Sequence, residues 1–184
     1  SGGTNLFFKL SESGMLMYKK VCSNTDDVIR HICVDGAGGV YLLSDLPLAG
    51  RQDMFLEKHD GSTGDVFWTR HISYDTSSMY NSELTVDNDN NVYTLGDFNY
   101  IVTDTFGSFE TSRNYRISKF SADGVLLWEH NYLTNLDSFI SAASVNTSVQ
   151  ISWHNSDIYV LAAKSHSSSY NYITINEIAP NGEE

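Results

Sequence analysis

Two short sequence units alternate along the chain, and this repetition constrains the fold more than any other feature. The first unit is an apolar strand, a turn of Asp, Asn and Gly, and a strand that carries Tyr; it occupies 34–41 and 86–93, with a divergent copy at 153–160. The second unit is a strand, a turn closed by Gly, and a strand that carries an aromatic residue; it occupies 7–18, 55–68 and 117–128, and begins again at 175–182. Asp, Asn and Gly supply the backbone angles that tight hairpin turns need. The chain therefore consists of alternating hairpins of two kinds.

The period of the repeat, about 50 to 65 residues with room for four strands, is typical of a propeller blade with one long loop. We therefore predict an all-β fold: a partial or open β-propeller of about three four-stranded antiparallel blades, plus two N-terminal strands of a preceding blade. The expected single domain covers 1–184, with a partial blade at 5–22, blades at 28–72 and 82–132, and an incomplete blade at 148–178. The expected strands are Leu6–Leu10, Met15–Cys22, Val28–Val34, Val40–Ser44, Asp53–Lys58, Asp65–Ile72, Ser82–Asp87, Asn91–Gly96, Arg113–Phe120, Val125–Tyr132, Ser148–Trp153, Ile158–Ala163 and Tyr170–Ile178.

This count is below the four blades that a closed ring needs. The favoured explanation is that the chain is a segment of a longer propeller. Two alternatives are open: its unpaired edge strands associate with another chain, or the architecture is an open sandwich or solenoid.

The pattern Val-Asp-x-x-x-x-Val-Tyr, followed by a strand that closes in Asp-Gly and then Leu-Leu-Trp, resembles the NHL and SBBP groups of β-propellers. The spacing from Gly124 to Trp128 is similar to that of quinoprotein-like and BamB-like propellers. The resemblance implies blades that run from an inner to an outer strand. These motifs specify a blade and say little about chemistry.

The formal net charge of −12 argues against two classes of partner. A nucleic-acid binder needs a basic stripe, which is missing here, and no apolar run approaches the ~18 to 20 residues of a membrane helix. We expect no nucleic-acid partner, no membrane insertion, and an extracellular, cell-surface or periplasmic location.

Residues with catalytic or metal-binding potential are scattered. The six histidines lack metal-ligand spacing, no Gly-x-Ser-x-Gly elbow occurs, and His71 and His130 are expected at solvent-facing positions of outer strands. Cys22 and Cys33 are expected to lie too far apart to form a disulfide. We expect both to be small buried apolar side chains. We predict no catalytic residues.

One acidic turn carries oxygen ligands at alternate positions. Asp87, Asp89 and Asn91 form a candidate calcium site, although calcium prefers six to eight oxygens and the equivalent stretch after Asp35 is mostly glycine. The alternative is a hairpin turn. Calcium is the one cofactor that we consider for the chain itself.

Aromatic residues among small polar ones mark two predicted loops on one face. The wide loop Asp97–Ser112 contains Phe98, Tyr100, Phe106 and Phe109, and the connection Ser73–Asn81 contains Tyr74 and Tyr80. Such side chains suit stacking on a sugar or contact with a protein, or they pack the loop itself.

The sequence thus predicts a non-enzymatic extracellular or cell-surface binding or scaffold module that holds a protein or glycan partner on a propeller face. One alternative is a propeller enzyme, either a lyase or hydrolase, or an oxidoreductase with a quinone and calcium. Another is a structural subunit that self-associates by strand exchange through its unpaired edges.

Overall fold

A computed structural model gives the structure of the chain and describes residues 5–21, 28–48, 51–73, 79–103, 109–133, 146–165, 171–179 and 181. These residues contain thirteen strands and no helix, so the prediction of an all-β fold is confirmed. None of the described residues belongs to a helix long and apolar enough to cross a membrane.

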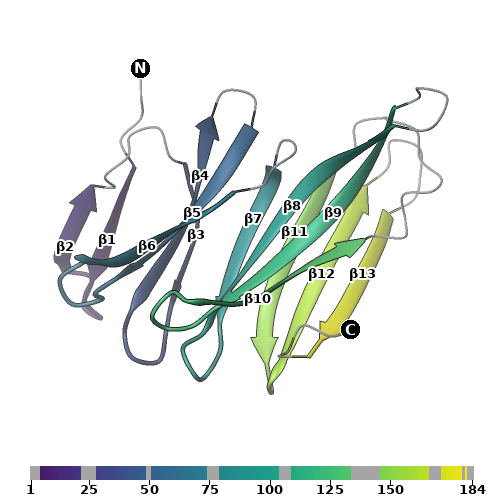
Figure 1. Ribbon diagram of the computed structural model, residues 1–184. Helices are drawn as coiled ribbons and strands as arrows, with labels where there is room; N and C mark the ends of the chain where they lie inside the picture. The colour runs from purple at the N-terminus through teal and green to yellow at the C-terminus, as the bar shows by residue number, and fades with distance from the viewer. Residues whose placement is uncertain are drawn as a thin grey trace.

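The strands form four antiparallel sheets in which sequence neighbours pair (Figure 1). The N-terminal sheet contains β1 (Leu6–Leu10) and β2 (Leu16–Val21). The second sheet contains β3 (Val28–Val34), β4 (Val40–Leu48), β5 (Arg51–His59) and β6 (Val66–Ile72). The third contains β7 (Met79–Val86), β8 (Val92–Thr103), β9 (Phe109–Phe120) and β10 (Leu126–Leu133). The fourth contains β11 (Asn146–His154), β12 (Asp157–Ser165) and β13 (Asn171–Ile178).

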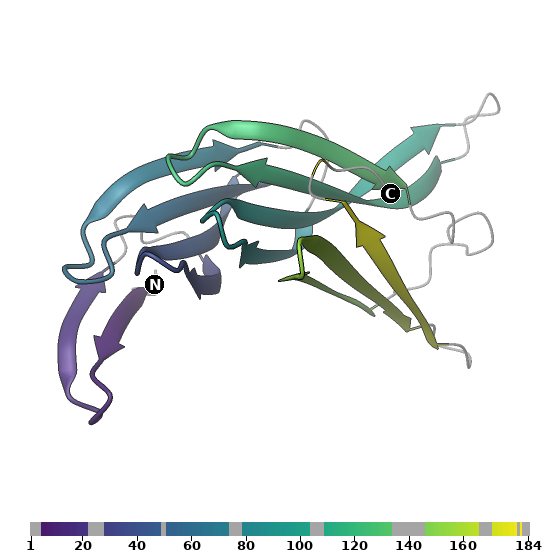
Figure 2. The ribbon, with the colours of Figure 1, turned by 90° about the horizontal axis from the view of Figure 1, so that it is seen from below.

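The sheets lie side by side in chain order, from the N-terminal sheet to the fourth sheet (Figures 1 and 2). The first strands of the second, third and fourth sheets are neighbours, because β7 contacts β3 on one side and β11 on the other. The four-stranded sheets run from an inner strand, β3 or β7, to an outer strand, β6 or β10. This number and order of strands agrees with the repeat count from the sequence.

An apolar cluster fills each space between neighbouring sheets. Phe7 packs with Val40 and Leu42 between the N-terminal and second sheets. The cluster between the second and third sheets contains Tyr41, Leu43, Met54, Leu56, Ile72, Leu84, Val92 and Phe120. The cluster between the third and fourth contains Tyr93, Leu95, Tyr115, Ile117, Ile151, Ile158, Val160 and Ile178. A strand such as β4 is covered on both faces, which explains why its apolar run does not alternate with polar residues.

Three hairpin turns of the second repeat unit have the same backbone conformation. Gly14, Gly64 and Gly124 have φ angles of +80°, +75° and +77°. Residues with a side chain rarely adopt this left-handed conformation, which explains why these three copies of the unit have glycine at this position. In the acidic turn after β7, Asn90 takes the corresponding role with a φ of +63°.

The predicted wide loop Asp97–Ser112 is the main error in the expected secondary structure. β8 continues to Thr103 and β9 begins at Phe109, so Phe98, Tyr100 and Phe109 lie in paired strands. Tyr80 likewise lies in β7 and not in a loop, whereas Tyr74 and Phe106 are outside the described residues. The stretch from Phe98 to Thr103 is rich in aromatic and β-branched residues, whose preference for strands outweighs the Asn and Asp content read as a loop signal.

Candidate functional site

The acidic turn after β7 is held together by the carboxylate of Asp87. Its Oδ1 accepts hydrogen bonds from the backbone N–H groups of Asp89 and Asn91, at 3.0 and 2.8 Å. Its Oδ2 accepts the side-chain amide of Asn91 at 2.9 Å and the hydroxyl of Tyr93 at 2.9 Å. Asp87 therefore closes the hairpin by binding four donors from its own turn.

The turn after β3 repeats this arrangement. The Oδ1 atom of Asp35 accepts the N–H groups of Ala37 and Gly39, at 3.0 and 2.6 Å, and its Oδ2 accepts the hydroxyl of Tyr41 at 3.2 Å. The Asp and the Tyr six residues later thus have the same partners in both copies of the first repeat unit. The sequence repeat is a repeat of hydrogen bonds.

A lysine and a tryptophan from the outer hairpin complete each arrangement. Lys58 Nζ lies 3.1 Å from Asp35 Oδ2 and 5.0 Å from the centre of the Tyr41 ring, and the Trp68 ring lies edge-on to Tyr41 at 5.9 Å. We call these four residues the second-sheet cluster. In the third-sheet cluster the corresponding distances are 3.5 Å from Lys119 to Asp87, 4.8 Å from Lys119 to the Tyr93 ring, and 6.0 Å from Trp128 to Tyr93, for the members Asp87, Tyr93, Lys119 and Trp128.

Burial and hydrogen bonding shift the pKa values of these groups. Burial, supported by the hydrogen bond to Asp87, raises the pKa of Tyr93 far above its usual value. Burial also acts to raise the pKa of Asp87, but the hydrogen bonds that Asp87 accepts and the charge of Lys119 outweigh it, so the net pKa is lowered. Burial acts to lower the pKa of Lys58, and its bonds to Tyr41 and Asp35 raise it overall. These pKa shifts keep the Tyr93 phenol neutral and keep Asp87 and Lys58 charged.

The same lysine and tryptophan also reach the next sheet. Lys58 Nζ and Trp68 Nε1 both donate to the backbone oxygen of Ala122, at 3.2 and 3.1 Å, in the turn between β9 and β10. Lys9 Nζ makes the equivalent bond to the Gly61 oxygen at 2.7 Å, in the turn between β5 and β6. The outer turns of the second and third sheets are therefore each bound by the outer hairpin of the preceding sheet.

Two glycines allow this close approach between sheets. A Cβ atom at Gly124 would lie 2.9 Å from the Trp68 ring and 3.1 Å from Arg70 Nε, and one at Gly64 would lie 2.8 Å from the Tyr18 ring. Tyr18, Trp68 and Trp128 occupy the same place in the repeat, four residues after Gly14, Gly64 and Gly124. The Gly-to-aromatic spacing seen in the sequence is therefore the signature of a sheet-to-sheet contact.

In this geometry the candidate calcium residues Asp87, Asp89 and Asn91 bind one another and stabilise the hairpin turn. A calcium ion at Asp87 would have to displace the four internal donors of that carboxylate, and Asp89 is exposed to solvent. Over the ranges described above, no group of three or more His, Cys, Asp or Glu side chains is arranged to hold a metal ion.

The described histidines and cysteine do not converge on a reactive centre either. His71 and His130 lie on the outer strands β6 and β10 and are exposed, as expected. His71 Nε2 lies 2.7 Å from Asp53 Oδ2, and its ring stacks on Phe55. Cys33 is a free thiol, and burial raises its pKa to about 12, so it is not activated as a nucleophile; Cys22 is outside the described residues.

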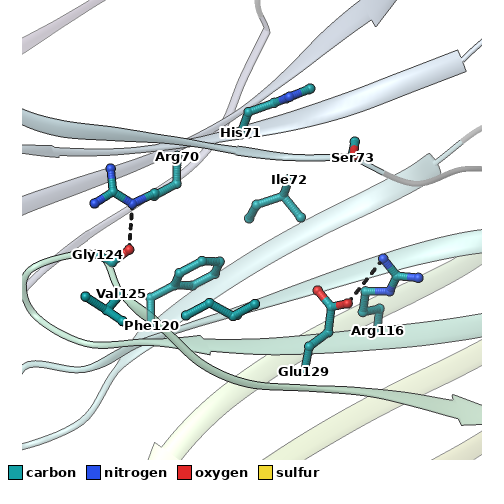
Figure 3. Close-up of a pocket in the computed structure, with 10 residues that line it drawn as sticks. Arg70, His71, Ile72, Ser73, Arg116, Phe120, Gly124, Val125 and Glu129 are labelled. Carbon is teal, nitrogen blue, oxygen red and sulfur yellow. Dashed lines mark hydrogen bonds and ion pairs between the residues drawn. The ribbon is translucent and has the colours of Figure 1, made fainter.

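A cleft of about 460 Å³ lies between the second and third sheets, where β6 faces β9 and β10 (Figure 3). Ile72, Phe120 and Leu126 form its apolar part. The charged groups at its sides are Arg70, Arg116 and Glu129. The volume is in the range of small-molecule sites.

The charged groups of the cleft bind protein atoms. Arg70 Nε donates to the Gly124 oxygen at 2.6 Å, and its other nitrogens donate to the Thr69 and Asp123 oxygens. Arg116 Nε donates to Asn131 Oδ1 at 2.8 Å, and Arg116 Nη1 lies 3.5 Å from Glu129 Oε1. These arginines hold the third sheet together and bind it to the second. The cleft is therefore a boundary between two sheets, and its charged side chains already bind other protein groups.

Sequence reasoning missed the cleft residues and the lysines of the clusters. The available signal was the position of Lys58 and Lys119 in equivalent copies of the second repeat unit. Arg70 and Arg116 are two of only 11 Lys and Arg residues in a strongly acidic chain, which also makes them candidates for specific pairing.

The long hairpin of the third sheet provides the most prominent surface feature. Over the residues described, β7 pairs with β8 as far as Phe98, and β10 pairs with β9 as far as Asn114. β8 and β9 continue to pair with each other from Asn99 and Arg113 to Thr103 and Phe109. This two-stranded extension, 99–103 with 109–113, is called the projecting ribbon here; it extends beyond the other strands at the upper right of Figure 1. Phe98 lies at its base, and Tyr100 and Phe109 lie within it.

Comparisons with known proteins reach only the fold. No protein-family model matches the chain, and no curated protein sequence matches it. Among solved structures, part of the TcdA4 protein of Morganella morganii, determined by cryo-EM, is similar, with a TM-score of 0.54 and 10% sequence identity. The match covers 86% of this chain and 7% of the TcdA4 chain. At this identity the likeness concerns the all-β fold alone.

Proposed function

We propose that the chain is a non-enzymatic binding and scaffold module outside the cytoplasm, built from propeller-type blades, whose projecting ribbon engages a protein or glycan partner. The four sheets in chain order, with equivalent contacts at the first two of their three boundaries, support the propeller-type assignment. The equivalence of the second- and third-sheet clusters supports a scaffold role, because their polar side chains bind one another and stabilise the turns and sheets.

The observation that carries the binding proposal is the length of the β8–β9 hairpin. Over the residues that the structure describes, the ribbon continues for five residue pairs beyond the last pairs that this hairpin makes with β7 and β10. A two-stranded ribbon alone is marginally stable in water. Within the described part of the chain neither edge of the ribbon pairs with a further strand, so its backbone donors and acceptors can bind an added strand. Its aromatic residues Tyr100 and Phe109 are of the type enriched in contacts with sugars and proteins.

A shortened chain tests this proposal. Replacing 99–113 with Asn-Gly would join Phe98 to Asn114 through a two-residue turn and keep the register of the third sheet, in which these residues pair. We expect the shortened chain to retain its thermal unfolding midpoint within a few degrees. We expect it to lose the ligands that the full chain binds on a glycan array or an array of purified cell-surface proteins.

A milder variant serves as the control for the ribbon backbone. Tyr100→Ala with Phe109→Ala keeps the length of the ribbon and removes two aromatic side chains. Loss of binding at least tenfold would assign the contact to these side chains, which corresponds to about 1.4 kcal/mol. If the shortened chain binds every ligand as tightly as the full chain does, the ribbon is not the binding surface and the proposal fails.

A further inference from the structure

The inner strands of three sheets carry an apolar residue at the same repeat position, with very different exposure. The position is Leu84 in β7 and Ile151 in β11, where the side chains are 2% and 7% exposed. In β3 the position is Ile32, which is 51% exposed. The same repeat position is thus buried twice and exposed once.

The difference follows from what covers each residue. Leu84 packs against the second sheet, in a cluster with Tyr41 and Leu43, and Ile151 packs against the third sheet, with Tyr93. Ile32 pairs with Leu42 and so lies on the face of the second sheet that meets the N-terminal sheet. A residue at this position of an inner strand is therefore buried only where the inner hairpin of the preceding sheet packs against it.

The N-terminal sheet covers only the outer part of that face. Phe7 and Tyr18 pack on Val40 and Leu42, which are 7% and 2% exposed. On the inner strand, Ile32 and Val34 pair with Leu42 and Val40 and so lie on this face, where they are 51% and 61% exposed. The exposed apolar strip of Ile32 and Val34 on β3 is therefore continuous with an existing sheet-to-sheet interface.

The repeat also identifies which edge of the N-terminal sheet is incomplete. Lys9 of β1 corresponds to Lys58 of β5, since both donate to the outer turn of the following sheet. β5 pairs with β6 on one edge and with β4 on the other. In the part of the chain that the structure describes, β1 pairs with β2 alone. The second edge of β1 corresponds to the edge of β5 that binds β4.

Charge supplies an independent argument for what fits there. Lys58 and Lys119 each contact an Asp carboxylate and a Tyr ring from the inner hairpin of their own sheet. Lys9 keeps the bond to the following sheet, to the Gly61 oxygen, and is exposed. An inner hairpin with the same Asp and Tyr would give Lys9 the same partners.

We propose that the second edge of β1 and the strip of Ile32 and Val34 together form a docking site for a β-hairpin of the repeat's own inner type. The hairpin consists of an apolar strand, a turn led by Asp, and a strand carrying Val-Tyr, and it brings the N-terminal sheet to four strands. Its second strand pairs with β1, its Asp binds Lys9, and its first strand covers Ile32. This site is distinct from the projecting ribbon and does not depend on the proposed function.

The chain carries a suitable hairpin, which makes a direct test possible. A copy of Val28–Ala49 is fused ahead of Ser1; because Lys9 matches Lys58, Ser1 then takes the place of Gly50. We expect hydrogen exchange of the β1 amides, Leu6–Leu10, to slow at least tenfold in the fused protein, because an edge strand becomes a central one. A fused copy with its Asp35 changed to Asn is expected to give less protection, because the carboxylate partner of Lys9 is lost.

A substitution at the strip distinguishes docking from a merely tethered hairpin. Ile32→Asp, made in the original copy, is expected to leave the urea midpoint of the unextended chain nearly unchanged and to lower that of the fused protein. Leu84→Asp is the matched control and should lower both midpoints. Unchanged β1 exchange in the fused protein, or an equal effect of Ile32→Asp on both proteins, would overturn the proposal. It also fails if the unextended chain dimerises with its β1 amides already protected, because the occupant is then a second copy.

Discussion

At the scale of single residues, the two Asp–Tyr pairs show how a turn and a core are linked. Asp87 binds two backbone N–H groups of its own turn and the buried hydroxyl of Tyr93, whose side chain is 0% exposed. Tyr93 in turn packs in the cluster between the third and fourth sheets. A polar side chain at a hairpin tip therefore fixes the position of a large core side chain.

Replacement of Asp87 by Asn tests this link through its pH dependence. Asn can accept from the backbone but offers its amide to the Tyr93 hydroxyl, so we expect a loss of about 2 kcal/mol at pH 7. Because the native pKa of Asp87 is lowered, its stabilisation is complete above its unfolded pKa of about 3.9 and is lost as the pH falls through the native value. The difference between variant and parent should therefore shrink below about pH 4.

Urea unfolding measured from pH 7 to pH 3 gives these free energies. The exposed Asp123, in the turn after β9, provides a control, since Asp123→Asn should leave the free energy of unfolding at pH 7 nearly unchanged. A constant difference between Asp87→Asn and the parent at every pH would contradict an ionic role for this carboxylate.

At the scale of elements, the outer hairpins act as connectors between sheets. The turn of one outer hairpin carries the backbone oxygens, and the preceding outer hairpin carries the Lys and the aromatic ring that bind it. Gly124 lies at the contact, whereas Gly14 has the same backbone conformation with no atom of another residue near its Cβ position. Substitutions at Gly14 and Gly124 can therefore distinguish the free-energy cost of the backbone conformation from that of disturbing the contact with Trp68.

Gly124→Ala is therefore expected to destabilise the chain more than Gly14→Ala. Both pay about 1 to 2 kcal/mol for a left-handed backbone with a side chain. Only Gly124→Ala also pushes on the Trp68 ring, for a further ~1 to 3 kcal/mol. Thermal unfolding of the two variants measures this difference, and Trp fluorescence should shift only for Gly124→Ala. Equal losses would show that the Trp68 contact does not bear on stability.

Element boundaries were predictable wherever the turn residues were distinctive. Leu6–Leu10 and Val28–Val34 match the structure because Gly and Asp turns follow them directly. The stretch from Asp97 to Ser112 was misassigned because its polar residues lie within strands whose aromatic and β-branched neighbours dominate. The candidate site was harder to predict: the role of Asp87 in a turn follows from the sequence, whereas its contact with Lys119 depends on strand register and the cleft on the packing of two sheets.

At the scale of the whole molecule, the apolar core is divided into separate clusters. One lies at each boundary between neighbouring sheets. Ile158, which is 0% exposed, belongs to the cluster between the third and fourth sheets, and Leu56, also 0% exposed, to the cluster between the second and third. In such stacked architectures stability is approximately a sum over units and their nearest-neighbour interfaces.

Unfolding is therefore expected to be local. Ile158→Ala should cost about 2 to 5 kcal/mol at the boundary of the fourth sheet. Hydrogen exchange should speed up in β11–β13 while β4 and β5 keep most of their protection. Leu56→Ala should reverse this pattern by weakening the second and third sheets first. A uniform increase of exchange over all sheets in both variants would instead indicate one cooperative unit.

The direction of the contacts between outer hairpins has a consequence for biosynthesis. Lys9 binds an oxygen 52 residues further along the chain, and Trp68 binds one 54 residues further along. The anchoring side chains leave the ribosome first, and the turn that they capture follows about one repeat later. During synthesis each new sheet can therefore pack against the preceding sheet, which has already been made. The sheets can thus fold in the order in which they are synthesised.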